Sequence, residues 1–384
     1  MKLNKCKLGD IITQRREKYN GESLPICGVT REGFIPPKQK EADTSLYNVF
    51  YEKDFVFNPA RMELNSIVYN DVYKKAICSS LYEVFYVNKP DIILPEFLAL
   101  LVKQNWFTRY CEFLGSGSAR EYCRVANISQ IEIDYPNIET QKKIVNEYRI
   151  IKERIQIKKQ INDNLVAVGT ASIQKNVGRG ALINLTEAEM DRLTLPKNFE
   201  IQTVSEFCCE TKSGSTPSRT NNEYWENGTI SWVKSGEVHN NITLQTEEHI
   251  TPLGLSESST KLLPKDTVLM AMYGVTAGEV GYLAIEATTN QAICGMICNS
   301  KAEAAYLYFT LIQSQAEISR LSNGGAQDNL SKNFIDNIKI VVPPSEFIEK
   351  LNLAVIVEQM TLNTKEISLL EELQSIALAQ LSSC

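Results

Sequence analysis

The segment GSGSAREYCRVANISQIEIDYPNIE (residues 115–139) returns in outline as SNGGAQDNLSKNFIDNIKIVVPPSE (residues 322–346), 207 residues later and without a gap. Both copies combine a glycine-containing loop, an Ile-x-Ile alternation typical of a strand, a proline, and an acidic residue that opens a helix. Such a repeat indicates that one structural plan is used twice. The seven identical pairs are Gly117/Gly324, Ala119/Ala326, Ile128/Ile335, Ile131/Ile338, Ile133/Ile340, Pro136/Pro343 and Glu139/Glu346.

Each copy repeats the same order of elements. A body of strands and turns is followed by a helix (residues 95–114 and 302–321), the glycine-containing loop, one strand and a long polar helix. This order predicts an α/β (α+β) protein with two tandem domains, each a mixed β-sheet body with helices. We expect a first domain over residues 1–138, a helix and linker over 139–180, a second domain over 181–345, and a final helix over 346–384.

The two long helices carry narrow apolar seams on otherwise charged surfaces. Such seams predict that the helices pack as an antiparallel coiled coil, and the alternative is that each packs on its own domain. At 1.5 Å per residue each helix would span on the order of 50–55 Å, the length of a spacer. The seam residues are Ile144, Tyr148, Ile151, Ile155, Ile157, Ile161, Leu165 and Val168 in the first helix, and Leu351, Val355, Leu362, Leu369, Leu373, Ala377 and Leu381 in the second.

The composition is that of a soluble globular protein, with 43% hydrophobic and 22% charged residues among 384. The first residues lack the apolar core of a signal peptide, and no apolar stretch is long enough to cross a bilayer, so we expect a cytoplasmic location. Ten cysteines without a Cys-x-x-Cys pair, and only two histidines, argue against a disulfide framework or a structural zinc site. Cys294 and Cys298 are interpreted as buried small apolar residues.

Charge is distributed unevenly along the chain. Residues 1–180 carry 27 Lys/Arg and 21 Asp/Glu, a net +6, and residues 181–384 carry 13 and 25, a net −12. Proteins that bind DNA usually present a basic face. An acidic second half therefore has to be explained by any function that involves DNA.

Motifs for catalysis are missing from the sequence. There is no Gly-Lys-Ser/Thr phosphate loop, no Gly-x-Gly-x-x-Gly fingerprint, and no Asp/Asn-Pro-Pro-aromatic methyltransferase motif. Pro90-Asp91 and Glu210-Thr211-Lys212, the fragments of a nuclease motif, lie in different copies. His239 and His249 occur in polar stretches that read as exposed loops. We expect no catalytic residue and no metal site.

Several segments resemble one family. KSGSTPSRTNNEYWENGTISWVKSGEV (residues 212–238) and SNGGAQDNLSKNFIDNIKIVVPP are similar to target-recognition domains of type I restriction–modification specificity subunits. DFVFNPARMELNSIVYN (residues 54–70), AICSSLYEVFYV and the closing segment of the first copy resemble an alternative form of that domain. The resemblance covers essentially the whole chain.

The resemblance implies a non-catalytic subunit that reads a split double-stranded DNA site through two recognition domains. The long helices would set the gap between the half-sites. The expected partners are two methyltransferase subunits and two motor/nuclease subunits, with no membrane. S-adenosylmethionine, ATP and magnesium would bind those partners and not this chain. The acidic second half would be balanced either by a local basic patch (Lys212, Arg219, Lys234 and Lys332) or by the methyltransferase subunits.

Arginine suits guanine, and asparagine or glutamine suits adenine, so polar loop residues of these kinds are the candidates for DNA contact. Gly214 and Pro217 indicate a shaped loop, and Trp225 and Trp232 are interpreted as anchors of the core or of loops. Two alternatives stay open: a DNA-modifying enzyme with a degenerate active site, and a coiled-coil scaffold. The candidate DNA-binding residues are Arg15, Arg16, Lys18, Arg61, Arg120, Arg124, Lys212, Ser215, Arg219, Asn221, Lys234, Tyr273, Gln327 and Asn329.

Overall fold

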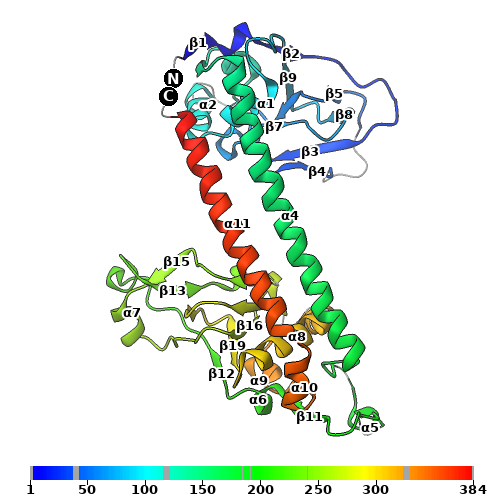
Figure 1. Cartoon of the computed structure of the whole chain (residues 1–384). Coiled ribbons are helices and arrows are strands. Elements are labelled where there is room, and N and C mark those ends of the chain that lie inside the picture. Colours follow the sequence, from blue (N-terminus) through cyan, green and yellow to red (C-terminus); the bar gives the residue numbers. More distant parts are fainter. Residues whose placement is uncertain are drawn as a thin grey trace. The chain divides into compact units, whose positions relative to one another are not determined.

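The computed structural model describes residues 3–37, 43–115, 122–183, 185–190, 192–239, 241–322 and 329–382. Its contacts divide the chain into two compact units (Figure 1). Unit 1 comprises Met1–Ile155 with Leu370–Cys384, and unit 2 comprises Gln156–Leu369. Among the described residues, no helix combines the length and the apolar composition needed to cross a membrane.

Unit 1 contains two four-stranded sheets, in the orders β2-β9-β6-β7 and β4-β3-β8-β5. The first is antiparallel throughout, and the second includes the parallel pair β3 and β8. The strands are β1 (Asn4–Lys7), β2 (Ile12–Arg15), β3 (Ile26–Thr30), β4 (Gly33–Ile35), β5 (Asn48–Tyr51), β6 (Phe55–Phe57), β7 (Val68–Tyr69), β8 (Lys75–Cys78), β9 (Glu83–Val87) and β10 (Glu132–Tyr135).

The helices of unit 1 are α1 (Pro95–Val102), α2 (Asn105–Gly115), α3 (Val125–Ile128) and the first part of α4 (Ile138–Asn176). The single helix expected over residues 95–114 is therefore wrong, because the chain turns between α1 and α2. The Gln104 backbone bonds to the Leu101 carbonyl there, and its buried side chain donates to the Leu100 carbonyl. These local bonds compete with continuation of the helix.

Unit 2 contains a five-stranded sheet, β12-β19-β16-β17-β14, and a three-stranded sheet, β15-β13-β18. The strands are β11 (Glu200–Thr203), β12 (Glu210–Ser213), β13 (Ile230–Val233), β14 (Ile242–Thr243), β15 (Glu248–Ile250), β16 (Thr267–Ala271), β17 (Val280–Leu283), β18 (Thr288–Thr289), β19 (Ile293–Ile297) and β20 (Lys339–Val342). The helices are α5 (Glu187–Met190), α6 (Val204–Phe207), α7 (Pro252–Ser256), α8 (Lys301–Ser322), α9 (Lys332–Asp336), α10 (Ser345–Lys350), the end of α4 and the first part of α11 (Leu353–Ser382), whose residues from Leu370 on belong to unit 1.

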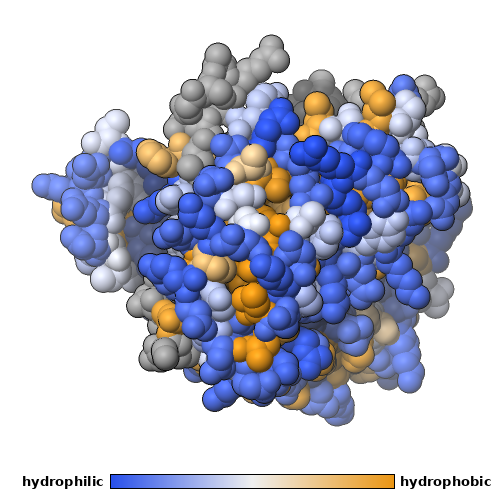
Figure 2. All heavy atoms as spheres, turned by 90° about the horizontal axis from the view of Figure 1, so that it is seen from above, coloured by the Kyte–Doolittle hydropathy of each residue, from blue (hydrophilic) through white to orange (hydrophobic). Residues whose placement is uncertain are grey.

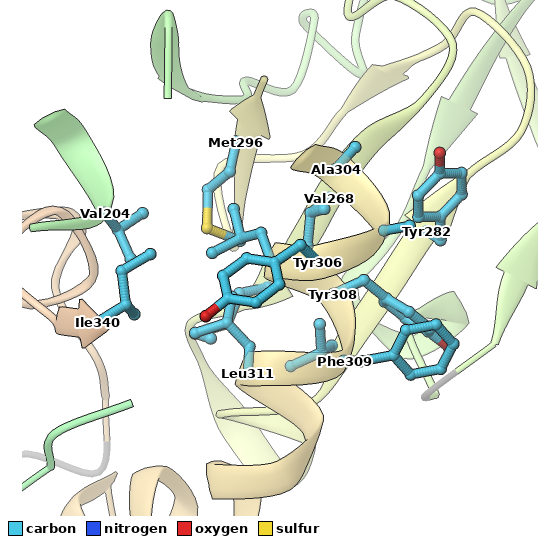
Figure 3. Close-up of a cluster of buried hydrophobic side chains, with 14 of the residues drawn as sticks. Val204, Val268, Tyr282, Met296, Ala304, Tyr306, Tyr308, Phe309, Leu311 and Ile340 are labelled. Carbon is cyan, nitrogen blue, oxygen red and sulfur yellow. The ribbon is translucent and has the colours of Figure 1, made fainter. Parts of the chain in front are cut away.

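Helix α8 supplies the centre of the unit 2 core. Tyr306, Phe309 and Leu311 of α8 are fully buried and lie close to Val268 and Met296 of the large sheet (Figure 3). Burial of such aromatic side chains contributes much of the apolar area of a core. The middle of α8, from Ala304 to Leu311, is buried on every side, because residues of the sheet, α4 and α11 pack around it.

The repeat has the same structural role in both units. In unit 1 the opening strand β1 pairs antiparallel with β10, and in unit 2 β11 pairs antiparallel with β20. The repeated isoleucines are buried in both copies, as Ile133 and Ile340 show. The prediction of two mixed α/β domains built on one plan is confirmed.

Within unit 2, the second half of α4 and the adjoining part of α11 run antiparallel (Figure 1). Asn162 lies opposite Asn363, and Lys158 lies opposite Glu366. The start of α11 also packs on the unit 2 core through Val357. The predicted antiparallel packing is therefore confirmed for this part of the chain, and it coexists with packing on the domain itself.

The predicted seam residues of this region are mostly wrong. Their side chains are 37–61% exposed, and these residues are Ile157, Ile161, Val168, Val355, Leu362, Leu369 and Leu373. The buried or half-buried face keeps Ile155 and Leu165 of the predicted seam and otherwise follows Lys158, Asn162 and Gly169 on α4, and Leu353, Val357, Met360, Asn363 and Ile367 on α11. Polar residues of the true seam bond to one another, so hydrophobicity alone selected the wrong stripe.

The second long helix is also divided. Helix α10 ends before Leu351, and Asn352 adopts a left-handed backbone with φ of 53° before α11 begins. Asparagine tolerates this conformation better than most residues. The single final helix expected over residues 346–384 is therefore two helices, and the absence of glycine and proline from this segment did not indicate the break.

Candidate nucleic-acid interface

A shaped loop follows strand β12 of unit 2. A side chain added at Gly214 would place its Cβ 2.2 Å from the Thr289 carbonyl oxygen, so only glycine fits there. The Trp232 indole donates to the Ser215 carbonyl at 3.1 Å, and the Ser215 hydroxyl accepts from Ser259 at 2.8 Å. Asn221 caps the short helical turn that follows. The predicted shaping of this loop is confirmed.

Arg219 stacks on an aromatic pair at the surface of unit 2. Its guanidinium lies 3.6 Å from the centroid of Trp225 and 4.8 Å from that of Trp232. The two indoles are perpendicular, with centroids 5.0 Å apart, and Trp232 is buried. The interpretation of both tryptophans as anchors is confirmed, because Trp232 is buried and the two indole N–H groups bond to the loop carbonyls of Ser215 and Ser218. The indoles also stack with Arg219.

Glu248 of strand β15 binds two of the predicted cations. Its carboxylate accepts from Arg219 and lies 3.3 Å from the Lys234 ammonium, which also bonds to Glu247 at 2.5 Å. The hydrogen bond from Arg219, followed by that from Lys234, lowers the pKa of Glu248. Glu248 therefore stays ionised, and it neutralises the charge that the loop would offer to a phosphate.

The remaining two residues of the predicted basic patch are neutralised as well. Lys212 lies 2.8 Å from Glu210, and Lys332 lies 2.5 Å from Asp336. A local basic patch of Lys212, Arg219, Lys234 and Lys332 was one of the two expected ways of balancing the acidic second half, and each of these four cations has an acidic partner within unit 2. Glu210 and Asp336 are sequence neighbours of the lysines they pair with, whereas Glu248 lies 29 residues from Arg219 and meets it only through the fold.

Tyr273 and Asn329 are brought together by an isolated β-bridge, although 56 residues separate them in sequence. Tyr273 precedes a tight turn in which Gly274 and Gly278 have φ of 72° and 88°, values that favour glycine. Val275 at the tip of this turn is fully exposed. Gln327 lies outside the described residues.

In unit 1, Arg15 is held by partners of its own domain. Its guanidinium forms a two-pronged ion pair with Asp54, at 2.6 and 3.0 Å, and stacks 4.7 Å from both Tyr51 and Tyr86. Burial raises the pKa of Asp54, and the bonds from Arg15 oppose that shift. If Arg15 contacts DNA, its guanidinium donors have to bond to DNA as well as to Asp54.

The other unit 1 candidates differ in how far they are engaged. Arg16 donates to Gln14 at 3.0 Å, Lys18 donates to Asn48 at 2.7 Å, and Arg124 pairs with the mostly buried Glu83 at 3.1 Å. Arg120 lies outside the described residues.

Arg61 is exposed, and its side chain has no partner among the residues that the structure describes. It lines a cavity of about 620 Å³ together with Arg31, Asn58, Tyr47 and Tyr82. Arg61 is therefore the predicted contact of unit 1 whose donors are most available to a ligand.

Groups that suggest catalysis are sparse in the described part of the chain. No cluster of His, Cys, Asp and Glu there has the geometry to hold a metal ion. His239 and His249 are exposed, and His239 contacts Glu279 at 2.6 Å. Burial raises the pKa of the Cys294 thiol to about 12, which disfavours the nucleophilic thiolate. Cys294 is fully buried as predicted, and Cys298 is half-buried.

The type I restriction modification DNA specificity domain matches residues 5–167 and again residues 196–371. This chain belongs to that family. Its two units thus each correspond to one specificity domain, and the second match includes the loop after β12, the Tyr273 turn and most of α11.

Relatives with this domain include two curated specificity subunits. The type I restriction enzyme HindI specificity subunit of Haemophilus influenzae is 22% identical over 365 residues, covering 77% of this chain and 79% of the relative. The MjaIX specificity subunit of Methanocaldococcus jannaschii is 22% identical over 300 residues, covering 76% and 69%.

A solved structure has the same fold. The type I restriction–modification S subunit from M. genitalium aligns with a TM-score of 0.58 at 16% identity, over 99% of this chain and 96% of that one. At this identity the likeness concerns the fold, and contacts of specific side chains have to be judged on this chain alone.

Sequence reasoning missed the acidic partners Glu247, Glu248 and Glu83, and the aromatic walls around Arg15. Glu247 and Glu248 are adjacent in the sequence, but Glu248 meets Arg219, 29 residues away, because the antiparallel register of β13 and β15 places Glu248 opposite Trp232, on which Arg219 stacks. Reading the charge of a loop without that register overestimates its positive potential.

Proposed function

We propose that this chain is the DNA-specificity subunit of a type I restriction–modification complex, in which it reads a split site and catalyses no reaction itself. One observation carries the proposal: two specificity domains are joined by one continuous helix, α4, of 39 residues. One end of α4 packs into the core of unit 1 through Ile144, and the other packs into the core of unit 2 through Ile173. A continuous helix anchored at both ends suits a spacer between two half-sites.

The proposed partners are two methyltransferase subunits and two motor/nuclease subunits. S-adenosylmethionine, ATP and magnesium would act on those subunits. The exposed apolar residues of α4 and α11 support a docking surface for the methyltransferase subunits, because three on each helix recur at spacings of four or seven residues. They are Ile157, Ile161 and Val168 on α4, and Val355, Leu362 and Leu369 on α11. Apolar stripes of this kind are expected at interfaces and are costly when left in water.

The paired charges of unit 2 bear on DNA affinity. Because Glu210, Glu248 and Asp336 neutralise the predicted cations of that unit, we infer that the methyltransferase subunits supply much of the positive potential around the DNA. The isolated chain should then bind DNA weakly. We also place the complex in the cytoplasm, where its DNA substrate is found.

Mapping of methylated bases by long-read sequencing tests the function. Genomic DNA would be compared from three kinds of cells, all of which contain the methyltransferase partner. The first also contains this chain, the second lacks it, and the third contains its Arg61→Ala variant. A split motif methylated only with the chain present is expected, with the variant altering one half of it. Methylation that persists unchanged without the chain would favour a scaffold, and methyl transfer or cleavage by the purified chain alone would favour an enzyme.

A further inference from the structure

A cavity of about 620 Å³ opens beside strand β3 in unit 1. Its apolar lining includes the buried Cys27 and Val29 and the half-exposed Leu64, and its polar lining includes Asn58 and Ser66. Pockets for small organic ligands typically have this size and this mixture of apolar walls and few polar groups. The volume is ample for one nucleotide.

Two arginines line the cavity, and both are exposed. Neither Arg31 nor Arg61 has a side-chain partner in the described part of the chain. By contrast, Arg15, Arg16 and Arg124 are all bonded to groups of their own unit. Guanidinium groups recognise phosphate through paired donors, so Arg31 and Arg61 are suited to hold a phosphate at this cavity.

The cavity also carries groups suited to a base. Tyr47 and Tyr82 are half-buried in its wall and offer aromatic surface for stacking. The side-chain oxygen Oδ1 of Asn58 accepts a hydrogen bond from the Ala60 backbone N–H at 3.1 Å, which orients the side-chain amide. Its Nδ2 donors have no partner among the described residues, and they can donate to a base edge that carries acceptors.

Surrounding bonds fix this lining. The Ser66 hydroxyl donates to the backbone carbonyl of Asn58 at 3.3 Å, and the Arg61 backbone N–H donates to the same backbone carbonyl at 3.0 Å. Asn65 follows with a left-handed backbone, φ 48°, and its side chain donates to the Val102 carbonyl at 3.1 Å. The residues on either side of Arg61 are therefore positioned before any ligand arrives, which lowers the entropy lost on binding.

We propose that this cavity binds a single nucleotide, with the base between Tyr47, Tyr82 and Asn58 and its phosphate on Arg31 and Arg61. The proposed function favours a nucleotide that is extruded from the first half-site of bound DNA, and this assignment of the ligand rests on that function. Extrusion costs unstacking energy, which contacts in the cavity would offset. A free mononucleotide has the same chemistry and is the other source.

The first arm of the test detects extrusion. The complete complex of this chain with its methyltransferase subunits is mixed with duplexes in which 2-aminopurine replaces one base of the first half-site at a time. This probe becomes several-fold brighter when it leaves the stack. We expect one bright position in addition to the base that the methyltransferase subunits modify. That signal should be lost in R31A/R61A and in L64W, which fills the cavity from a half-exposed position.

The second arm detects a free ligand. The full chain is titrated calorimetrically with each deoxynucleoside monophosphate, and binding that disappears in R31A/R61A and L64W identifies a mononucleotide site. Arg109→Ala is the matched control, because Arg109 is an exposed arginine of unit 1 outside the cavity. It should behave as the wild type in both arms.

The outcomes separate the inference from the function it builds on. If no extra position becomes bright and no monophosphate binds, the cavity is not a nucleotide site and the proposal is overturned. If the wild-type complex methylates no split motif, the specificity function fails, while the calorimetric arm still decides whether the cavity binds a nucleotide.

Discussion

Asn363 of α11 donates a 2.9 Å hydrogen bond from Nδ2 to the Oδ1 of Asn162 on α4, inside the seam of the antiparallel helices of unit 2. The Asn363 side chain is 1% exposed, and its own Oδ1 accepts from Lys158 at 3.1 Å. Lys158 in turn pairs with Glu366 at 2.8 Å. A buried amide in a helix seam favours one register, because a slip of seven residues would place Asn162 opposite Ile356 or Leu370 without a partner.

Removing this amide should destabilise unit 2. Asn363→Ala leaves Asn162 and Lys158 without their buried partner, and we expect a loss of about 1–3 kcal/mol in the free energy of unfolding. Urea unfolding monitored by circular dichroism measures it. Asn164→Ala, at an exposed position of α4, is the control and should change stability little. Equal effects of the two variants would contradict a structural role for the pair.

Gly169→Ala should be destabilising even though alanine normally favours a helix by up to about 1 kcal/mol over glycine. A Cβ at Gly169 would lie 2.3 Å from the Phe309 ring, so the ring or the helix must move, at a cost of about 1–3 kcal/mol. Thermal unfolding measures the loss. If the clash with the Phe309 ring causes the loss, Gly169→Ala should destabilise the Phe309→Leu variant less than it destabilises the wild type. An equal loss of stability in the two backgrounds would refute the contact.

Glu248→Gln should increase the affinity of the chain for non-specific DNA. The change frees Arg219 from its carboxylate and removes one of two acidic partners of Lys234, so up to about two further phosphate contacts become possible and the dependence on salt becomes steeper. Fluorescence anisotropy with a labelled duplex at several salt concentrations measures both. Glu226→Gln, at an exposed glutamate, should leave affinity and slope unchanged. A flat response in Glu248→Gln would show that this loop does not face DNA.

Leu362→Glu should weaken assembly with the methyltransferase subunits by about tenfold or more, because it places a charge in the exposed apolar stripe. The stability of the chain alone should hold, since Leu362 is exposed. Size-exclusion chromatography at graded concentrations reports the assembly. Leu253→Glu, another exposed leucine of unit 2, serves as the control, and normal assembly of Leu362→Glu would place the docking surface elsewhere.

Deletion of one heptad from α4, residues 147–153, should shorten the gap between the half-sites. Seven residues of helix correspond to about 10 Å, or roughly three base pairs, and removing a whole heptad keeps the seam in phase. Both half-sites should persist in methylation maps of the variant. A gap of unchanged length would refute the proposed spacer role of α4.

The sequence predicted which residues shape the loop of the candidate site, but it did not predict which of the cations there are ion-paired. Trp232, Gly214 and the loop around them were recognised from residue type, because a glycine and an aromatic anchor have few other roles in such a loop. The availability of Arg219 and Lys234 was misjudged, because their carboxylate partners come from another strand. Arg61 resembled the other candidates in sequence, and only the structure distinguishes it by a cavity and by free donors.

The sequence by itself determined the duplicated α/β plan, the buried isoleucines of both copies and the long helices, because these depend on local periodicity and on a repeat with a fixed offset. Only the tertiary structure decided which stripe of α4 and α11 is buried, since Asn162, Lys158 and Asn363 become compatible with burial only when they bond to one another. It also decided which cations are neutralised, because charge pairing follows proximity in space, and strand register brings Glu248 to Arg219 across 29 residues.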